Sequence, residues 1–229
     1  MFKSRSDKKE LLDAAIIPDS DLYQNLKELH SINHLLGGYN VSFHALSKTL
    51  TSSKNYSLVD IGSGGGDTLK ELLKWNKKKE YQLQLTGIDL KQACINYAKN
   101  NNPQPEISFI CDDYKNMSLH VETIDIIHAC LFCHHLSNEE IVALIEFAKQ
   151  QKAILVINDL ERNPLAYYSI KLLTKLFSKS YLVKNDAPLS VLRGFKKREW
   201  KQLMLIANTK KYSIKWKWAF RHEVIIYPS

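Results

Sequence analysis

A glycine-rich turn between an apolar run and a helical pattern constrains the fold of this chain more than any other feature. The apolar run ends at Ile61, and the turn that follows reads Gly62-Ser63-Gly64-Gly65-Gly66. Glycines permit a tight turn and a close approach of the backbone to a ligand, because they carry no Cβ atom. Leucines at positions 69, 72 and 73 then repeat at helical spacing. A strand, a glycine turn and a helix in this order predict the front of a nucleotide-binding β-α-β unit.

Three carboxylates around this turn indicate which ligand it binds. Asp89 ends the next apolar segment, where an acid accepts hydrogen bonds from ribose hydroxyls. Asp67 occupies the sixth position of the turn, at which a dinucleotide-binding loop has glycine or alanine, and Asp60 precedes the turn. Two carboxylates there repel a pyrophosphate, whereas they suit an amino group and a sulfonium. The sequence therefore predicts S-adenosylmethionine as the ligand and negligible binding of NAD.

The chain resembles the class I S-adenosylmethionine-dependent methyltransferases, and most of all the small-molecule branch that includes C-methyltransferases of ubiquinone and menaquinone biosynthesis. The resemblance covers about residues 55–160 and rests on four ordered motifs. They are Asp60-x-Gly62-x-Gly64-x-Gly66, the acid Asp89, the segment 107–113 and the segment 125–136, which ends in His-His-Leu. The ordered set is more specific than the first motif alone.

The resemblance implies most of a cofactor pocket, and Ala129 and Cys130 are added because ligands of open α/β sheets bind at the carboxyl edge. The expected cofactor-binding residues follow four strands: Asp60, Gly62, Ser63, Gly64, Gly66, Asp89, Leu90, Asp112, Asp113, Ala129 and Cys130. Asp112 corresponds to the acid that meets the adenine amino group. Asp113 stands where the family has a small residue, so either acid can hold that role. Methyl transfer of this kind requires no metal.

Candidate catalytic residues follow the fourth and fifth predicted strands. His134 and His135 are candidate general bases, because an imidazole can take a proton from a phenol or an acidic carbon. The alternative is that one of them only stabilises the local turn. Asp159 ends the fifth strand and either orients the acceptor or has a structural role. The string Cys130-Leu131-Phe132-Cys133-His134 matches a haem-attachment pattern, but its place at a buried strand exit argues against both haem and a crowded zinc site.

Three further residues are candidates for the acceptor side. Tyr39 follows a glycine pair and could cover the sulfonium with its ring, unless it is a core aromatic. Arg193 could bind a carboxylate or phenolate of the acceptor, or form a structural salt bridge. Tyr168 is a candidate residue for the wall of the acceptor site.

The whole chain is expected to form one α/β domain with a doubly wound, mostly parallel, seven-stranded, Rossmann-like sheet. It divides into a helical N-terminal cap outside the core (1–54), a cofactor-binding core (55–160), a helical lid between strands five and six (161–205) and terminal antiparallel strands (206–229). The predicted core strands are 57–61, 83–88, 107–111, 124–129 and 153–158. Residues 185–195 show little helical periodicity.

The net charge of +8 admits nucleic acid, an anionic lipid surface or an acidic substrate as partner, and a solvated lysine-rich surface is the plain interpretation. Lysines 171, 175 and 179 form a stripe along one predicted helix, which could contact membrane phosphates. The chain has neither a membrane-spanning apolar run nor an apolar leader, so a cytoplasmic protein is expected. Its oligomeric state is not predicted.

These observations predict methyl transfer to a small molecule. The acceptor atom would be an aromatic, polyketide-like or quinone-like oxygen, or a carbon activated by a neighbouring oxygen. An RNA methyltransferase is the alternative that the charge permits. Nucleic acid is nevertheless not the expected partner, because the strand-four exit lacks the Asn/Asp-Pro-Pro-aromatic string and no RNA-binding part is appended. A cofactor-binding protein without catalysis is the third hypothesis.

Overall fold

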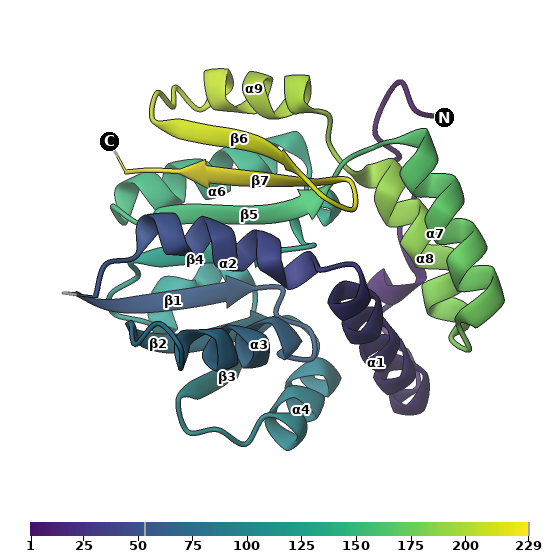
Figure 1. Cartoon of the computed structure of the whole chain (residues 1–229), viewed down its shortest axis with the longest axis horizontal. Coiled ribbons are helices and arrows are strands. Elements are labelled where there is room, and N and C mark those ends of the chain that lie inside the picture. The colour runs from purple at the N-terminus through teal and green to yellow at the C-terminus, as the bar shows by residue number, and fades with distance from the viewer. Residues whose placement is uncertain (53, 229) are drawn as a thin grey trace.

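The computed structural model describes residues 1–52 and 54–228. Ser53, within the predicted cap, and Ser229, the last residue of the predicted terminal segment, lie outside the described residues. One seven-stranded sheet runs through the molecule in the order β3-β2-β1-β4-β5-β7-β6, with helices on both faces (Figure 1). The strands are β1 (Asn55–Ile61), β2 (Gln82–Asp89), β3 (Ile107–Cys111), β4 (Ile126–Cys130), β5 (Ile154–Leu160), β6 (Tyr212–Lys217) and β7 (Arg221–Ile226).

The α-helices are α1 (Asp19–Leu35), α2 (Gly38–Thr49), α3 (Asp67–Asn76), α4 (Gln92–Asn101), α5 (Met117–His120), α6 (Asn138–Gln150), α7 (Pro164–Phe177), α8 (Tyr181–Arg193) and α9 (Lys197–Ile206). Short 3₁₀ turns cover Leu11–Asp13, Tyr114–Asn116 and Cys133–His135. Among the described residues, no helix has the length and apolarity needed to cross a membrane.

The predicted seven-stranded α/β sheet is confirmed, and it is mixed. The strands β1 to β5 are mutually parallel, whereas β7 is antiparallel to both β5 and β6. The strand order reverses between β1 and β4, and ligands of open α/β sheets bind at such a point, outside the carboxyl ends of the strands. The sheet therefore offers one edge for the site.

Two apolar layers hold the helices on the sheet. Strands covered on both faces read as continuous apolar runs, as Leu58, Val59 and Ile61 of β1 do. One layer packs β1, β2 and β4 against α2, α3 and α4, and the other packs the opposite face against α6 and α9. Within the predicted N-terminal cap (1–54), Ala45 and Leu46 of α2 are part of the first layer, so this helix packs directly on the sheet.

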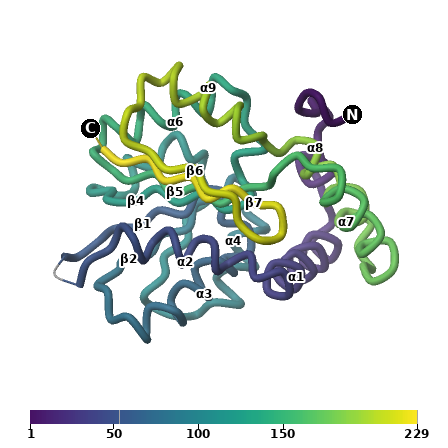
Figure 2. The backbone as a smooth tube through the Cα atoms, turned by 45° about the horizontal axis from the view of Figure 1, so that its top comes forward, coloured from purple at the N-terminus to yellow at the C-terminus, as the bar shows by residue number. Residues whose placement is uncertain are grey.

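The helical segment after β5 differs from its prediction in two ways. Residues 185–195 show little helical periodicity in the sequence, yet α8 extends to Arg193 and contains Pro188. Tertiary packing of Leu182, Val183 and Val191 outweighs the hydrogen bond that proline removes. In addition, α9 packs on α6 rather than over the sheet edge, so only α7 and α8 form the helical pair near α1 beyond the carboxyl ends of β1 and β5 (Figures 1 and 2).

Candidate active site

A cavity of about 650 Å³ lies at the carboxyl edge of the sheet. Its walls come from the glycine turn, the exits of β1, β2 and β4, the helices α1, α7 and α8, the 3₁₀ turn near the N-terminus and the β6–β7 turn. This volume is within the range of cofactor and small-ligand pockets. The cavity therefore lies where the sheet topology places a ligand, and its volume is large enough for a cofactor together with part of an acceptor.

The glycine turn begins the cavity wall with a left-handed backbone. Gly62, Gly64 and Gly66 have φ angles of 65°, 52° and 73°. A Cβ at Gly62 would lie 2.1 Å from the Phe132 ring, and one at Gly66 would lie 2.5 Å from the Phe109 ring. At Gly64 the nearest atom would be 3.6 Å away, so this glycine leaves room for a ligand. Gly64 lines the cavity, whereas Gly66, expected to bind the cofactor, does not.

Asp89 connects the glycine turn to the exit of β2. Its carboxylate accepts hydrogen bonds from the backbone N–H groups of Gly64 and Lys91, both at 2.9 Å. Burial raises the pKa of Asp89, although both hydrogen bonds oppose this. A carboxylate offers about four lone-pair sites, so these two bonds leave acceptor capacity for ribose hydroxyls. Asp89 lines the cavity, as the ribose-binding assignment requires.

Asp60 begins a buried polar chain. Its carboxylate lies 2.7 Å from Nδ1 of His128, whose Nε2 lies 2.9 Å from the Ser42 hydroxyl. Burial raises the pKa of Asp60, with His128 acting in the opposite direction. Asp60, Asp67 and Ser63 also line the cavity, so this part of the wall presents carboxylates to a ligand.

Tyr39 does not cover the ligand. Its buried hydroxyl donates to the Asp67 carboxylate, and the side chain does not line the cavity. The expectation of a sulfonium-covering ring is therefore corrected, because Tyr39 packs in the α1–α2 corner and holds Asp67 at the start of α3.

The two acids after β3 both reach the cavity but are held differently. Asp112 accepts hydrogen bonds from the His120 ring at 2.6 Å and from Asn116 at 3.0 Å, and the His120 bond lowers its pKa most. Asp113 caps the following 3₁₀ turn by accepting from the Lys115 backbone at 3.0 Å. Leu90 lines the cavity beside them, as does Cys130 at the β4 exit, whereas Ala129 is enclosed in the core.

His134 is oriented by a buried carboxylate. Oδ1 of Asp159 lies 2.7 Å from its Nδ1, and Oδ2 accepts from the His134 backbone N–H at 2.8 Å. Burial would raise the pKa of Asp159, but the charge of His134 and its hydrogen bond outweigh burial and lower it. A proton shared between Nδ1 and Asp159 leaves Nε2 free to accept one. Asp159 itself does not line the cavity, and its contacts are with His134 rather than with the cavity space.

Two acids of the N-terminal segment complete this cluster. Glu10 places its carboxyl oxygens 3.6 Å from Nε2 of His134 and 3.8 Å from Nε2 of His135, while Asp13 lies 3.2 Å from Nδ1 of His135. Burial raises the pKa of Glu10 to about 7. Burial would also raise the pKa of Asp13, but the hydrogen bond and charge of His135 outweigh it and bring it to about 2. Glu10, Asp13, His134 and His135 all line the cavity.

The sequence analysis missed Glu10 and Asp13, because long-range contacts bring them to the site. The only local signal is their spacing, since their side chains cap the short turn between them. One atom each of Glu10, His134 and His135 lies within 4.8 Å of the others, a grouping that could hold a metal ion. That the reaction needs no metal remains a prediction.

Comparison with known proteins identifies the domain. Residues 58–153 match a family model described as a methyltransferase domain. This segment contains the glycine turn, Asp89, His134 and His135. These residues are therefore a methyltransferase domain.

Solved structures share the fold of this methyltransferase. The plantazolicin methyltransferase BpumL in complex with SAH is 22% identical, with a TM-score of 0.64 over 92% of this chain and 89% of that one. A SAM-dependent methyltransferase from Aquifex aeolicus is 17% identical, with a TM-score of 0.61 over 92% and 98%. The CMeT domain of the citrinin polyketide synthase is 13% identical, with a TM-score of 0.55 over 79% and 48%. A comparison with curated proteins gives no significant match.

None of these three neighbours is named as a quinone-biosynthesis enzyme, so the predicted relation to that branch remains a prediction. The described residues of the methyltransferase do show why two acceptor-side predictions need correction.

Arg193 lies behind the 3₁₀ turn Cys133–His135 and does not line the cavity. Its guanidinium donates to the carbonyl oxygens of His134 at 3.0 Å, His135 at 3.1 Å and Lys8 at 2.7 Å. Arg5, which the sequence analysis missed, donates to the same turn at the His134 and Leu136 carbonyls. Both arginines therefore hold the histidine turn and the N-terminal segment together, and Arg193 has no donor set directed at an acceptor.

Tyr168 faces away from the cavity. It is 60% exposed and packs beside the Tyr167 ring at a centroid distance of 5.1 Å. The wall that α7 supplies consists instead of Ala166, Ser169, Ile170 and Leu173.

Proposed function

We propose that this methyltransferase transfers a methyl group to a protic group of an extended, largely apolar small-molecule or peptide-derived acceptor. One observation carries the proposal: the glycine turn and Asp89 share a single cavity with the Glu10–His134–His135 cluster. A cofactor held at the turn and an acceptor held at the cluster would therefore meet without any further opening.

The residues on the wall suit S-adenosylmethionine. Gly64 leaves open space, Asp89 has spare acceptor capacity, and Asp60 and Asp67 complement an amino group and a sulfonium. When bound, this cofactor supplies an activated methyl group to an in-line displacement. The protein then contributes positioning and exclusion of water.

His134 is the group that we assign as general base. The residue lines the cavity, its Nε2 lies 3.6 Å from the Glu10 carboxyl, and its Nδ1 is paired with Asp159 at 2.7 Å. During transfer, Nε2 takes the proton from the acceptor atom that attacks the methyl carbon, while Asp159 stabilises the resulting imidazolium. Asp159 is therefore a positioning residue.

The apolar part of the cavity wall favours an apolar acceptor. It consists of Leu29 and Ile32 from α1, Leu36 directly after that helix, Ile170 and Leu173 from α7, and Trp218 and Phe220 from the β6–β7 turn. BpumL has been solved in complex with monoazolic, triazolic and pentazolic desmethylPZN analogs, which supports an elongated acceptor by analogy of fold. The lining contains nine acids against three cations, which disfavours an RNA phosphate backbone.

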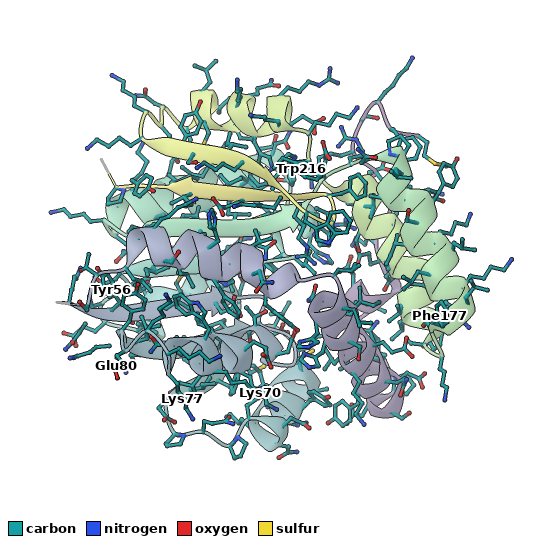
Figure 3. The ribbon with its side chains drawn as sticks, in the orientation of Figure 1. Tyr56, Lys70, Lys77, Glu80, Phe177 and Trp216 are labelled. Carbon is teal, nitrogen blue, oxygen red and sulfur yellow. The ribbon has the colours of Figure 1, made fainter. Side chains whose placement is uncertain are left out.

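The outward face of α7 supports a lipid surface as the place where such an acceptor is met. Leu165, Tyr168, Leu172 and Leu176 are more than half exposed and lie on one side of this helix. Exposed lysines at 171 and 175 border them, and Phe177 lies at the outer end (Figure 3). An apolar stripe beside cations is the pattern of a helix that lies on an anionic membrane.

Transfer from cofactor labelled in its methyl group tests the function. The enzyme is incubated with phenolic lipids, polyketide-like acids, azole peptides and an RNA extract, and the products are separated by solvent partition. Label should appear in the small-molecule fraction with the parent enzyme and be absent with His134→Ala. Label in RNA alone would overturn the proposal.

A further inference from the structure

Arg221 is a buried cation on the cavity wall. It is the first residue of β7 and is only 3% exposed. Nη1 donates to the amide oxygen of Asn158 at 3.1 Å, and Nη2 donates to that of Asn33 at 2.6 Å. Nε has no hydrogen-bond partner among the described residues. Of its five N–H donors, these contacts use two.

Its charge has no ionic partner, in contrast to two other buried arginines. Arg162 pairs with Glu199 at 2.5 Å, and Arg193 lies 3.5 Å from the Asp13 carboxylate. Among the described residues, no carboxylate oxygen lies within 4.0 Å of the Arg221 guanidinium, which contacts two neutral amides. A guanidinium stays charged inside a protein, and a buried charge without a counterion is costly. The arrangement therefore calls for an anion that arrives from the cavity.

Arg221 lies on the glycine-turn side of the cavity. Its partner Asn158 donates to the Ser42 hydroxyl at 3.0 Å and lies 3.5 Å from the sulfur of Cys130. Ser42 contacts His128, which contacts Asp60 directly before the glycine turn. A polar chain thus runs from the guanidinium to the residue that the methyltransferase motif places at the amino-acid end of the cofactor.

We propose that Arg221 binds the α-carboxylate of the methionine part of the cofactor. Asp60 and Asp67 suit the amino group and the sulfonium, but they repel that carboxylate. The other two cations of the lining already have partners, because Lys91 donates to a backbone carbonyl and Lys115 pairs with Glu140. Arg221 can offer the carboxylate two parallel N–H donors in charge-assisted bonds.

This assignment rests on the proposed cofactor, and two ligands separate the two claims. S-adenosylhomocysteine carries the carboxylate, whereas decarboxylated S-adenosylhomocysteine lacks only that group. By calorimetry, the parent protein should bind the first about 10–100-fold more tightly than the second. In Arg221→Gln this preference should fall below about threefold, because affinity for S-adenosylhomocysteine falls while affinity for the decarboxylated ligand stays the same.

Stability measurements exclude a merely structural role. Without ligand, Arg221→Gln should melt at or above the parent temperature, because it removes an uncompensated buried charge. Its gain in melting temperature on adding S-adenosylhomocysteine should be smaller. Ser42→Ala, which alters the same polar chain outside the cavity, is the matched control and should keep the preference for the carboxylate.

An unchanged preference in Arg221→Gln would overturn the proposal, and a raised KM for an acidic acceptor in that variant would place the anion on the acceptor instead. If the parent protein binds neither ligand, the proposed cofactor itself is wrong, and the assignment of Arg221 fails with it.

Discussion

The two halves of the cavity are assembled in different ways. The cofactor half consists mainly of strand exits and turns within residues 60–130, to which the fold adds Arg221, and its central contact joins Gly64 to Asp89 across 25 residues. The histidine half needs an N-terminal segment held by Arg5 and Arg193, with Arg5 lying 129 residues from the His134 carbonyl that it contacts. The first half is a local motif, and the second depends on remote docking. The two halves should therefore respond separately to substitution.

The strongest separation is expected from His134→Ala. Turnover should fall about 10²–10⁴-fold, because the proton acceptor is lost. Affinity for S-adenosylhomocysteine should stay within about twofold, since the glycine turn and Asp89 are untouched. Initial rates and calorimetry measure the two effects. His120→Ala, at the Asp112 end of the cavity, is the control and should largely retain turnover. Full turnover in His134→Ala would show that this histidine only stabilises the turn.

The opposite separation is expected from Asp89→Ala. Loss of charge-assisted bonds to the ribose should weaken cofactor binding by about 1.5–3 kcal/mol. Gly64→Val should block binding by filling open space and straining a positive φ. Calorimetry measures both, with the exposed Glu139→Ala, outside the cavity, as the control. Parent-like binding in both variants would place the cofactor elsewhere.

The pH dependence of stability should reveal the buried Glu10. Its pKa of about 7 in the folded protein lies above the usual 4.5, so its contribution to folding is full below pH 4.5 and is lost as the pH rises through 7. Glu10→Gln keeps the acceptor for Ser190 and removes the titration. Between pH 5 and pH 8, the free energy of unfolding of the parent should fall by on the order of 1–2 kcal/mol more than that of the variant. Urea unfolding at both pH values tests this, and equal pH slopes would contradict it.

The smallest effect is expected at the surface of α7. Reversing two charges in Lys171→Glu/Lys175→Glu should lower binding to phosphatidylglycerol-containing vesicles about five- to tenfold, because each basic residue near such a surface adds about 1 kcal/mol. The pair Lys77→Glu/Lys78→Glu makes the same charge change at a loop that lies across the molecule from Phe177 (Figure 3). Sedimentation with vesicles measures binding, and equal losses in both pairs would indicate nonspecific attraction only.

Sequence patterns described the cofactor half well because its signals are local. Glycines mark the positive-φ turn, apolar runs mark strands that are buried on both faces, and an acid marks the exit of β2. These features follow from steric and burial rules that act within a few residues. The same rules could not place Glu10, because neither its neighbours nor its spacing shows which distant element it will contact.

The sequence by itself determined the α/β class, the glycine turn, the choice of ligand and the neighbourhood of the two histidines. Only the tertiary structure decided that Glu10 and Asp13 join those histidines, that Arg193 supports the turn rather than an acceptor, and that Tyr39 holds Asp67. The physical reason is that a side chain's role depends on what desolvates it and what it hydrogen-bonds. For Arg221, those partners come from α1 and β5, more than 60 residues away along the chain.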